Sequence, residues 1–221
     1  MKKQLFILVL MLLPLVANAD DATVEITGID FLLRKQPLTA DKVSKNVEPI
    51  EKSTHSLEGD IIDIDSYKPD YTWISGYFSK TSADGKNVLL APNTDATLTL
   101  DESIEPATVV YKEPVVLTVC GTGAIGGTAS VNKAGEGTLC LQTTNTYTGA
   151  TVVHDGVLEF STLKNGGEPS SIGASVEFAQ NWILDGGTCR YTGTNTTTNR
   201  SAKLSASSVL DITKALCLPT T

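Results

Sequence analysis

The two histidines are the first residues to weigh for chemistry, because histidine exchanges protons near neutral pH. His154 stands directly before Asp155 and Gly156, at the end of a short apolar run. A histidine next to a carboxylate suggests part of a nucleophilic triad. However, consecutive strand residues face opposite ways, and the chain has no G-x-S-x-G motif. We expect His154 to be a solvated corner residue and His55, in KSTHSLEGD, to be exposed.

The densest acidic cluster lies in the run DIIDIDSYKPD and comprises Asp60, Asp63, Asp65 and Asp70. A calcium loop of the helix-loop-helix type needs oxygen ligands at alternate positions, then glycine and a bidentate glutamate. Here isoleucines alternate with the acids, and Tyr67 occupies a ligand position. The pattern therefore predicts a strand with Ile62 and Ile64 facing inward and Asp63 and Asp65 in solvent, and not a metal site.

Five basic residues could act on an acidic polysaccharide beside carboxylate-bound calcium: Lys133, Lys164, Arg190, Arg200 and Lys203. None of them stands beside a cluster of acids on the same strand face, and the polar run from Thr192 to Arg200 is typical of a loop. We assign no catalytic residue, no cofactor and no metal ligand. The sequence leaves open whether the chain is an enzyme and favours a protein without catalytic activity.

The four cysteines are Cys120, Cys140, Cys189 and Cys217, and an exported protein could join them in three ways. Cys140 and Cys189 occupy ordinary strand positions, so we expect free thiols. A disulfide between Cys120 and Cys140 is the alternative. Their separation along the chain is close to the length of one coil of the solenoid that the strand pattern predicts, so stacking of coils could bring them together. No histidine lies near any cysteine, which disfavours a zinc site.

The elements that must position these residues are clearest between Asn132 and Ser161. Three short runs there place apolar residues two apart: Leu139 and Leu141, Thr151 and Val153, and Leu158 and Phe160. A period of two puts each pair on one face of a strand, with Cys140, Val152 and Glu159 on the other face. Glycine, asparagine and aspartate separate the runs, as corners require. Strands this short bury their inward face only by stacking, so the pattern predicts a solenoid.

This stretch resembles the autotransporter-associated β-strand repeat of bacterial surface and secreted proteins, from K-x-G-x-G-T-L-x-L through N-T-Y-T-G-x-T-x-V to G-x-L. The structural positions of the motif are Gly135, Gly137, Leu139, Leu141, Asn145, Tyr147, Gly149, Val153, Gly156, Leu158 and Phe160. The match covers residues 132–161, and the segments NGGEPSSIGAS and NWILDGGTCRYTGTN are similar to those of Bacteroides-type bacteria. The resemblance implies a right-handed parallel β-helix on an exported protein, without catalytic activity. We expect Asn145 to stack its amide coil on coil and Tyr147 to fill space inside the turn.

Residues 1–19 are expected to be a signal peptide. Lys2 and Lys3 precede a short apolar core, and Ala17-Asn18-Ala19 is a cleavage site. No later stretch approaches the roughly 20 apolar residues that a membrane span needs. Cleavage would change the formal charge from −8 to −10, because Lys2 and Lys3 are lost. An acidic protein repels phosphate, so we expect no nucleic acid partner.

The composition divides the chain near residue 85. We expect a β-rich N-terminal cap over residues 20–85, in which Trp73 and the tyrosines cover the first coil and Tyr71–Phe78 opens a hairpin with an Asp84-Gly85 turn. Residues 86–221 are expected to form the all-β parallel β-helix, truncated at its C-terminus. Candidate strands include Asn87–Leu90, Thr138–Gln142, Val157–Ser161, Ser175–Ala179 and Thr188–Thr192.

The sequence as a whole favours a non-catalytic exported protein in the periplasm, on the cell surface or outside the cell. It would act as a scaffold, an adhesin-like stalk or a glycan-contacting module, with an extracellular glycan or a surface protein as partner. The alternative is the N-terminal fragment of a β-helix enzyme that degrades polysaccharides, either a lyase or a glycoside hydrolase. An aromatic platform for sugars is the alternative role of the N-terminal aromatic residues.

Overall fold

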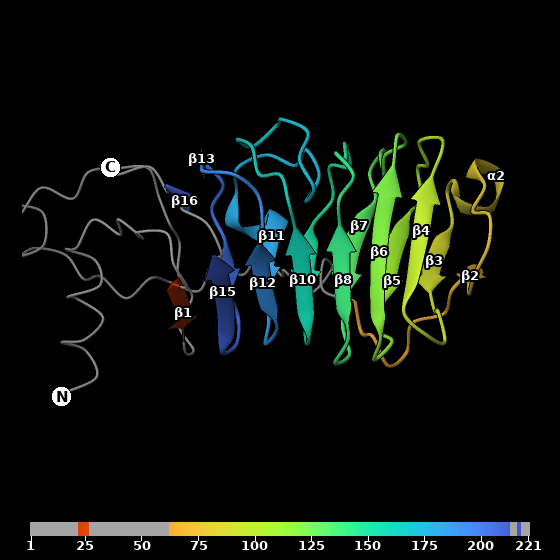
Figure 1. Cartoon of the computed structure of the whole chain (residues 1–221), viewed down its shortest axis with the longest axis horizontal. Coiled ribbons are helices and arrows are strands. Elements are labelled where there is room, and N and C mark those ends of the chain that lie inside the picture. The colour runs from red at the N-terminus through yellow and green to blue at the C-terminus, as the bar shows by residue number, and fades with distance from the viewer. Residues whose placement is uncertain (1–21, 27–61, 213–215, 218–221) are drawn as a thin grey trace, which may run out of the picture.

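The computed structural model describes residues 22–26, 62–212 and 216–217, and they form a parallel β-solenoid of about seven coils (Figure 1). Six coils contribute one strand to each of two seven-stranded sheets, and β2 at one end of sheet B and β1 at the other end of sheet A complete them. In spatial order sheet A contains β1 (Ala22–Ile26), β15 (Ser208–Ile212), β12 (Thr188–Tyr191), β10 (Val157–Phe160), β8 (Thr138–Leu141), β6 (Val116–Gly121) and β4 (Ala96–Leu100). Sheet B contains β14 (Lys203–Leu204), β11 (Trp182–Leu184), β9 (Thr151–Val153), β7 (Ser130–Lys133), β5 (Thr108–Tyr111), β3 (Asn87–Leu90) and β2 (Tyr71–Trp73).

The register shows how regular the coils are. Asn87 pairs with Thr108, and Thr138 pairs with Val157, so these coils are nearly equal in length. One coil is clearly longer, because Thr151 pairs with the more distant Trp182. Within these two stacks all neighbouring strands run parallel except β1, which is antiparallel to β15. The prediction of a parallel β-solenoid is therefore confirmed, and its right-handedness stays a prediction.

Two kinds of turn join the sheets. We call the short turns from sheet B to sheet A the narrow edge (residues 91–95, 112–115, 134–137, 154–156, 185–187 and 205–207). The longer connections back from sheet A to sheet B form the broad edge (residues 101–107, 122–129, 142–150, 161–181 and 192–202). In Figure 1 the broad edge lies at the top, where the connection of the long coil rises above the others. That connection, residues 161–181, is called the extended loop below.

The core lies between the sheets and consists of stacked columns. On sheet A one inward column runs through Leu98, Val119, Leu141, Phe160 and Tyr191, each paired with the next across neighbouring strands. All five are at most 2% exposed. Full burial of such a side chain contributes about 1.5–3 kcal/mol. Alternate positions thus form one continuous core along the solenoid, as the period of two predicts.

The first coil differs from the predicted hairpin. Trp73 ends β2, which pairs with β3 in parallel, and Ser79 then caps the N-terminus of a short helix, α2 (Lys80–Ala83). The hairpin prediction is wrong because the chain turns around the solenoid axis between β2 and β3 and does not fold directly back. Phe78 is buried and stacks on Tyr71, with ring centroids 5.6 Å apart, whereas Tyr77 is 67% exposed. The proposed role of residues 20–85 as a cap stays a prediction.

Two further strand predictions are wrong. Ser175–Ala179 is not a strand, because this part of the extended loop leads into a short 3-10 helix, η3 (Ala179–Asn181). The run after Asp60 forms a turn, in which Asp63 Oδ1 accepts a hydrogen bond from the Asp65 backbone N–H, although both acids are exposed as expected. The signal peptide at 1–19, His55 and Asp60 lie outside the described residues, as do residues 218–221. No helix in the described part of the chain is long and apolar enough to cross a membrane.

Candidate functional site

The repeat motif builds a cage around a lysine at the narrow edge. Lys133 is completely buried, and its ammonium donates hydrogen bonds to the backbone carbonyls of Ala134 (2.6 Å), Gly135 (2.6 Å) and Asp155 (3.0 Å). The Tyr111 ring of the preceding coil lies 5.5 Å from its Nζ. Burial lowers the pKa of Lys133 to about 8, and the nearby Asp155 carboxylate opposes the shift. The lysine therefore joins two stacked turns and is not available as a surface base.

Two motif glycines leave room for this cage. Gly156 has φ +63°, and a side chain there would collide with the carbonyl oxygens of Gly135 and Gly137 and with the Lys133 Nζ. Gly135 has φ +64° and lies against the Lys112 carbonyl of the preceding coil. Lys133, Gly135, Gly137 and Gly156 of the motif therefore lie together at one junction between successive coils.

Asn145 and Tyr147 occupy the broad edge of the same coil. The Asn145 Oδ1 accepts hydrogen bonds from the Ile125 backbone N–H (2.9 Å) and the Thr143 hydroxyl (2.9 Å). Its Nδ2 donates to the Ser171 carbonyl (2.8 Å), so the buried amide links residues from three successive coils. The amide pairs with backbone groups and does not form the predicted amide-on-amide stack, because backbone groups lie opposite it in both neighbouring coils.

The remaining motif residues face the core or the closely packed turns. Tyr147 is fully buried inside its turn, and its hydroxyl lies 2.7 Å from the Thr151 hydroxyl. The apolar positions are all buried in the common core: Leu139, Leu141, Val153, Leu158 and Phe160. A side chain at Gly137 or Gly149 would collide with backbone of the preceding coil. The motif places its buried residues where they join neighbouring coils.

Arg200 is buried, although the sequence predicts that it belongs to a polar loop. The side chain is 5% exposed. It extends from the next broad-edge connection, residues 192–202, and binds the extended loop. Its guanidinium donates to the carbonyls of Lys164 (3.0 Å), Glu168 (3.2 Å) and Gly173 (2.9 Å) and to the Ser175 hydroxyl (3.0 Å). Nothing in the local sequence distinguishes this arginine from a solvated one, because all its partners come from another coil.

The outer face of sheet A carries a small charged ladder. Arg190 Nε donates to Asp211 Oδ2 at 2.7 Å, and its Nη1 lies 3.8 Å from Glu159 Oε2. The three side chains belong to neighbouring strands in register and are only partly buried. Beside them is a shallow depression of about 250 Å³ lined in part by Cys140, Gln142 and Glu159. Partly exposed ion pairs of this kind contribute little to stability.

The prediction for His154 needs correction. Its side chain is 15% exposed, and its Nδ1 lies 3.2 Å from Asp185 Oδ2 in the next turn of the narrow edge. It is therefore mostly buried, and it is paired with a residue of the following coil and not with its sequence neighbour Asp155. Its local sequence could not show this, because the partner lies a whole coil further along the chain.

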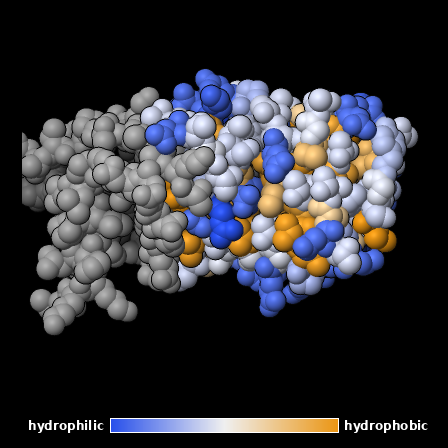
Figure 2. Space-filling model, in the orientation of Figure 1, coloured by the Kyte–Doolittle hydropathy of each residue, from blue (hydrophilic) through white to orange (hydrophobic). Residues whose placement is uncertain are grey.

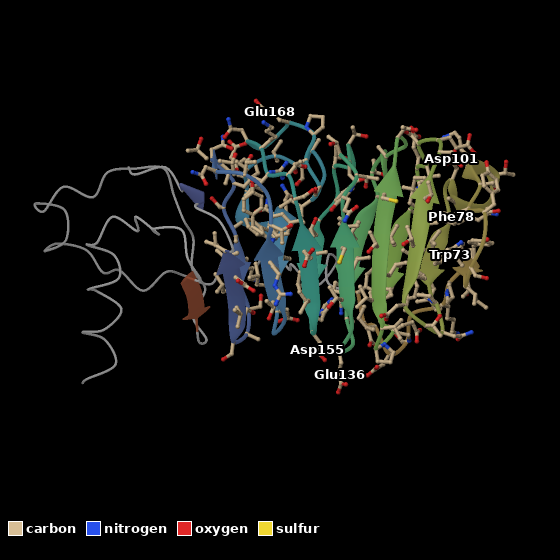
Figure 3. The ribbon with its side chains drawn as sticks, viewed as in Figure 1. Trp73, Phe78, Asp101, Glu136, Asp155 and Glu168 are labelled. Atoms are coloured by element: carbon tan, nitrogen blue, oxygen red, sulfur yellow. The ribbon has the colours of Figure 1, made fainter. Side chains whose placement is uncertain are left out.

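Other candidate groups are spread over the molecule. Glu136 and Asp155 lie at the narrow edge, whereas Asp101 and Glu168 lie at the broad edge (Figure 3). Among the described residues no group of three histidines, cysteines or acids is close enough to hold a metal ion. Cys120, Cys140 and Cys189 are free thiols. Cys140 aligns with Thr118 and not with Cys120, so the alternative disulfide does not form.

The extended loop presents apolar side chains to solvent. Val176 is 49% exposed and Phe178 is 57% exposed, and the acidic Glu177 between them is also exposed. The other large apolar side chains of the described residues with high exposure are Ile74, Tyr77 and Val116. The front face seen in Figure 2, which lies over the strands of sheet A, is mixed, with apolar patches beside charged ones. Val176 and Phe178 differ from the other exposed apolar residues because the buried Arg200 holds their loop in place.

The fold and the junction together define a parallel β-solenoid protein built from short coils. The chain carries the autotransporter-associated β-strand repeat: a family model described as the passenger-associated transport repeat matches residues 131–160, one residue from the predicted range. The chain is also 36% identical over 156 residues to a Brucella suis protein described as the adhesin BmaC autotransporter. That alignment covers 70% of this chain and 4% of the adhesin. No solved structure matches the chain.

Proposed function

We propose that this chain is a segment of an exported, surface-displayed rod that acts as a non-catalytic adhesin. The observation that carries the proposal is its similarity to part of an autotransporter adhesin, combined with a regular parallel solenoid. The same similarity gives the polysaccharide-degrading enzyme, the alternative from sequence, no support. The partner would be an extracellular glycan or a surface protein.

The solenoid supplies the mechanical part of this role. Successive coils contact only their neighbours, so the rod lengthens without changing its cross-section. Buried polar residues such as Lys133 and Asn145 bond across coils and fix how each coil is placed on the last. A rod of this kind presents its side chains at fixed positions away from the cell.

The extended loop is the part of the surface best suited to contact a partner. It is the longest broad-edge connection, and Arg200 holds it through four hydrogen bonds, three of them to backbone carbonyls. Val176 and Phe178 are therefore exposed on a fixed scaffold. Binding then costs little ordering of the loop, and an exposed aromatic side chain is a frequent anchor at protein interfaces.

Binding measurements on the purified chain test this role. The chain, immobilised on beads, is mixed with cultured epithelial cells, extracellular-matrix proteins and a glycan array. We expect retention of at least one of these. The double variant Val176→Ser/Phe178→Ser should lose at least about tenfold in binding, because interface anchors dominate affinity. The matched control is Val116→Ser on sheet A, which removes a side chain that is 40% exposed and should leave binding unchanged.

Three outcomes would count against the proposal. Absence of binding to every surface would contradict the adhesive role itself. Equal losses for the loop variant and the Val116→Ser control would contradict the extended loop as the contact point. Release of reducing ends from polysaccharides by the wild-type chain would show that it is an enzyme.

A further inference from the structure

A turn near the start of the extended loop contains a chemically reactive pair of residues. Asn165 is exposed, and it is the only asparagine of the chain that is followed directly by glycine. The amide nitrogen of a following glycine attacks an asparagine side chain readily, because glycine has no side chain that obstructs the approach. In such an attack the side-chain nitrogen leaves as ammonia. The pair Asn165-Gly166 is therefore a place where the backbone can rearrange spontaneously.

The fold requires glycine at position 166. A Cβ there would lie 2.3 Å from the Glu177 backbone nitrogen and 2.8 Å from the Val176 carbonyl carbon, so the two arms of the loop pass too closely for a side chain. The Glu168 backbone N–H donates to the Asn165 carbonyl (3.1 Å) and closes the turn at the broad edge (Figure 3). The reactive pair thus follows from the packing of the loop, and the arm that carries Val176 lies directly against it.

Asn199, in the next broad-edge connection, holds both of the groups that would react. Its backbone N–H donates to Asn165 Oδ1 (3.0 Å), and its side-chain Oδ1 accepts a hydrogen bond from the Gly166 N–H (2.7 Å). The first bond favours attack, because it stabilises negative charge that develops on the Asn165 oxygen. The second bond opposes attack, because it favours the protonated amide and fixes the nitrogen in place. The second bond controls the rate, since attack needs a free and deprotonated nitrogen.

We propose that Asn165 is a site of spontaneous deamidation and that the Asn199 side chain keeps the reaction slow. When the bond from Gly166 to Asn199 opens, the Gly166 nitrogen loses its proton to solvent and bonds to Asn165 Cγ. The Asn165 Nδ2 takes up a proton and leaves as ammonia. Water then opens the cyclic imide at either carbonyl carbon, which yields aspartate or isoaspartate at position 165.

The modification changes the shape of the extended loop. In isoaspartate the main chain runs through the former side chain and is longer by one carbon, next to the Glu177 backbone, where no side chain fits. Arg200 holds the preceding Lys164 carbonyl, so the displacement falls on the opposite arm, which carries Val176. A slow, irreversible reaction thus ends the fixed presentation of this arm. The modification is independent of the adhesive role, and only its consequence for binding rests on that role.

Peptide mapping of the whole chain by mass spectrometry tests the proposal. The folded protein is aged in mildly alkaline buffer, and aspartate and isoaspartate at position 165 are counted over time. We expect the reaction at Asn165 to be at least about fivefold faster in Asn199→Ala than in the wild type, the factor that one hydrogen bond of about 1 kcal/mol represents. The matched control is Asn195→Ala, which changes an exposed asparagine of the same connection and should leave the rate unchanged. Equal rates in the wild type and Asn199→Ala would overturn the protective role of Asn199.

Ageing of the unaltered chain in urea gives a second test that requires no variant. Unfolding removes the bond from Gly166, so the rate at Asn165 should rise at least about fivefold over that of the folded chain. A folded rate as high as the unfolded one would overturn the protection even if Asn199→Ala failed to fold. Within the folded chain, Asn165 should react faster than Asn195, which precedes the branched Thr196. Absence of isoaspartate at 165 from the aged wild type, or equal reaction at Asn195, would overturn the site itself.

Discussion

The narrow and broad edges of the solenoid both connect sheet A with sheet B, but their connections differ in length and in the space that they leave for side chains. At the narrow edge three to five residues connect the sheets, and glycines such as Gly156 leave no space for a side chain. At the broad edge the connections are longer, and the extended loop occupies 161–181 without disturbing the strands on either side. The difference shows where this fold can change: length and chemistry vary at the broad edge, while the narrow edge keeps successive coils together.

Both edges depend on the core between them, so the largest effect is expected there. Changing Leu139 to Asp places a charge at a position that is 1% exposed and should abolish folding, because an unpaired buried charge is too costly. Circular dichroism and thermal unfolding measure the result. Glu159→Lys is the control on the outer face of sheet A. It removes a long contact with Arg190 and should cost less than about 1 kcal/mol. Equal effects would mean that the inward and outward faces are assigned wrongly.

Glycine substitutions compare the edges directly. Gly156→Ala should destabilise the fold by about 3 kcal/mol, because the new methyl group collides with the lysine cage. Gly167→Ala in the extended loop has a similar positive φ of +84° but no atom within 4 Å, so it should cost only about 1–2 kcal/mol. Urea unfolding of both variants gives the two values. If the Gly167 variant proved the less stable one, the narrow edge would not be the tighter junction.

The lysine cage predicts a pH dependence at the narrow edge. The pKa of Lys133 is about 8 in the fold, compared with an ordinary value of 10.5, so between these values the unfolded chain binds more protons. Its contribution to stability should therefore rise from pH 8 to pH 10.5, by up to about 3 kcal/mol. The observable is the stability difference between wild type and Lys133→Met, in which the other titrating groups cancel. A difference that falls with pH over this range would contradict the sign of the pKa shift.

The smallest global effect is expected at the broad edge. Arg200→Gln removes most of the hydrogen bonds to the extended loop but leaves the strands intact. We expect faster proteolytic cleavage within 161–181, with a loss of global stability of about 1–3 kcal/mol. Mass spectrometry of the fragments locates the cut. Uniform cleavage along the chain would instead indicate that Arg200 holds the whole solenoid together.

The sequence predicts the strands and the stacked architecture well, because a period of two bounded by glycine is a local signal. Leu139, Leu141, Leu158 and Phe160 face the core as that period requires. The sequence fails where a residue acts through another coil. Lysine is ordinarily exposed, and nothing in the local pattern indicates that Lys133 is buried, whereas its carbonyl partners enclose it in the fold.

The same reason explains the other differences. Arg200 and His154 have their partners in a neighbouring coil, and neither partner is visible in the local pattern. Val152 is correctly predicted on the outward face, yet it is fully buried there, which the local pattern does not indicate. The Asp84-Gly85 dipeptide is typical of a hairpin, but β2 and β3 pair in parallel. Contacts between coils, more than local propensity, decide these positions.

The parallel stacking of coils is the central claim, and a spin-label distance tests it most directly. Outward positions 118, 140, 159, 190 and 211 align on successive strands of sheet A. Nitroxide labels at Thr118→Cys and Asp211→Cys, in a chain without its native cysteines, should be about 19 Å apart, the width of four strand spacings, plus the label linkers. A single narrow distribution near that distance is the predicted result. A broad distribution, or one centred above about 35 Å, would contradict the stacked parallel solenoid.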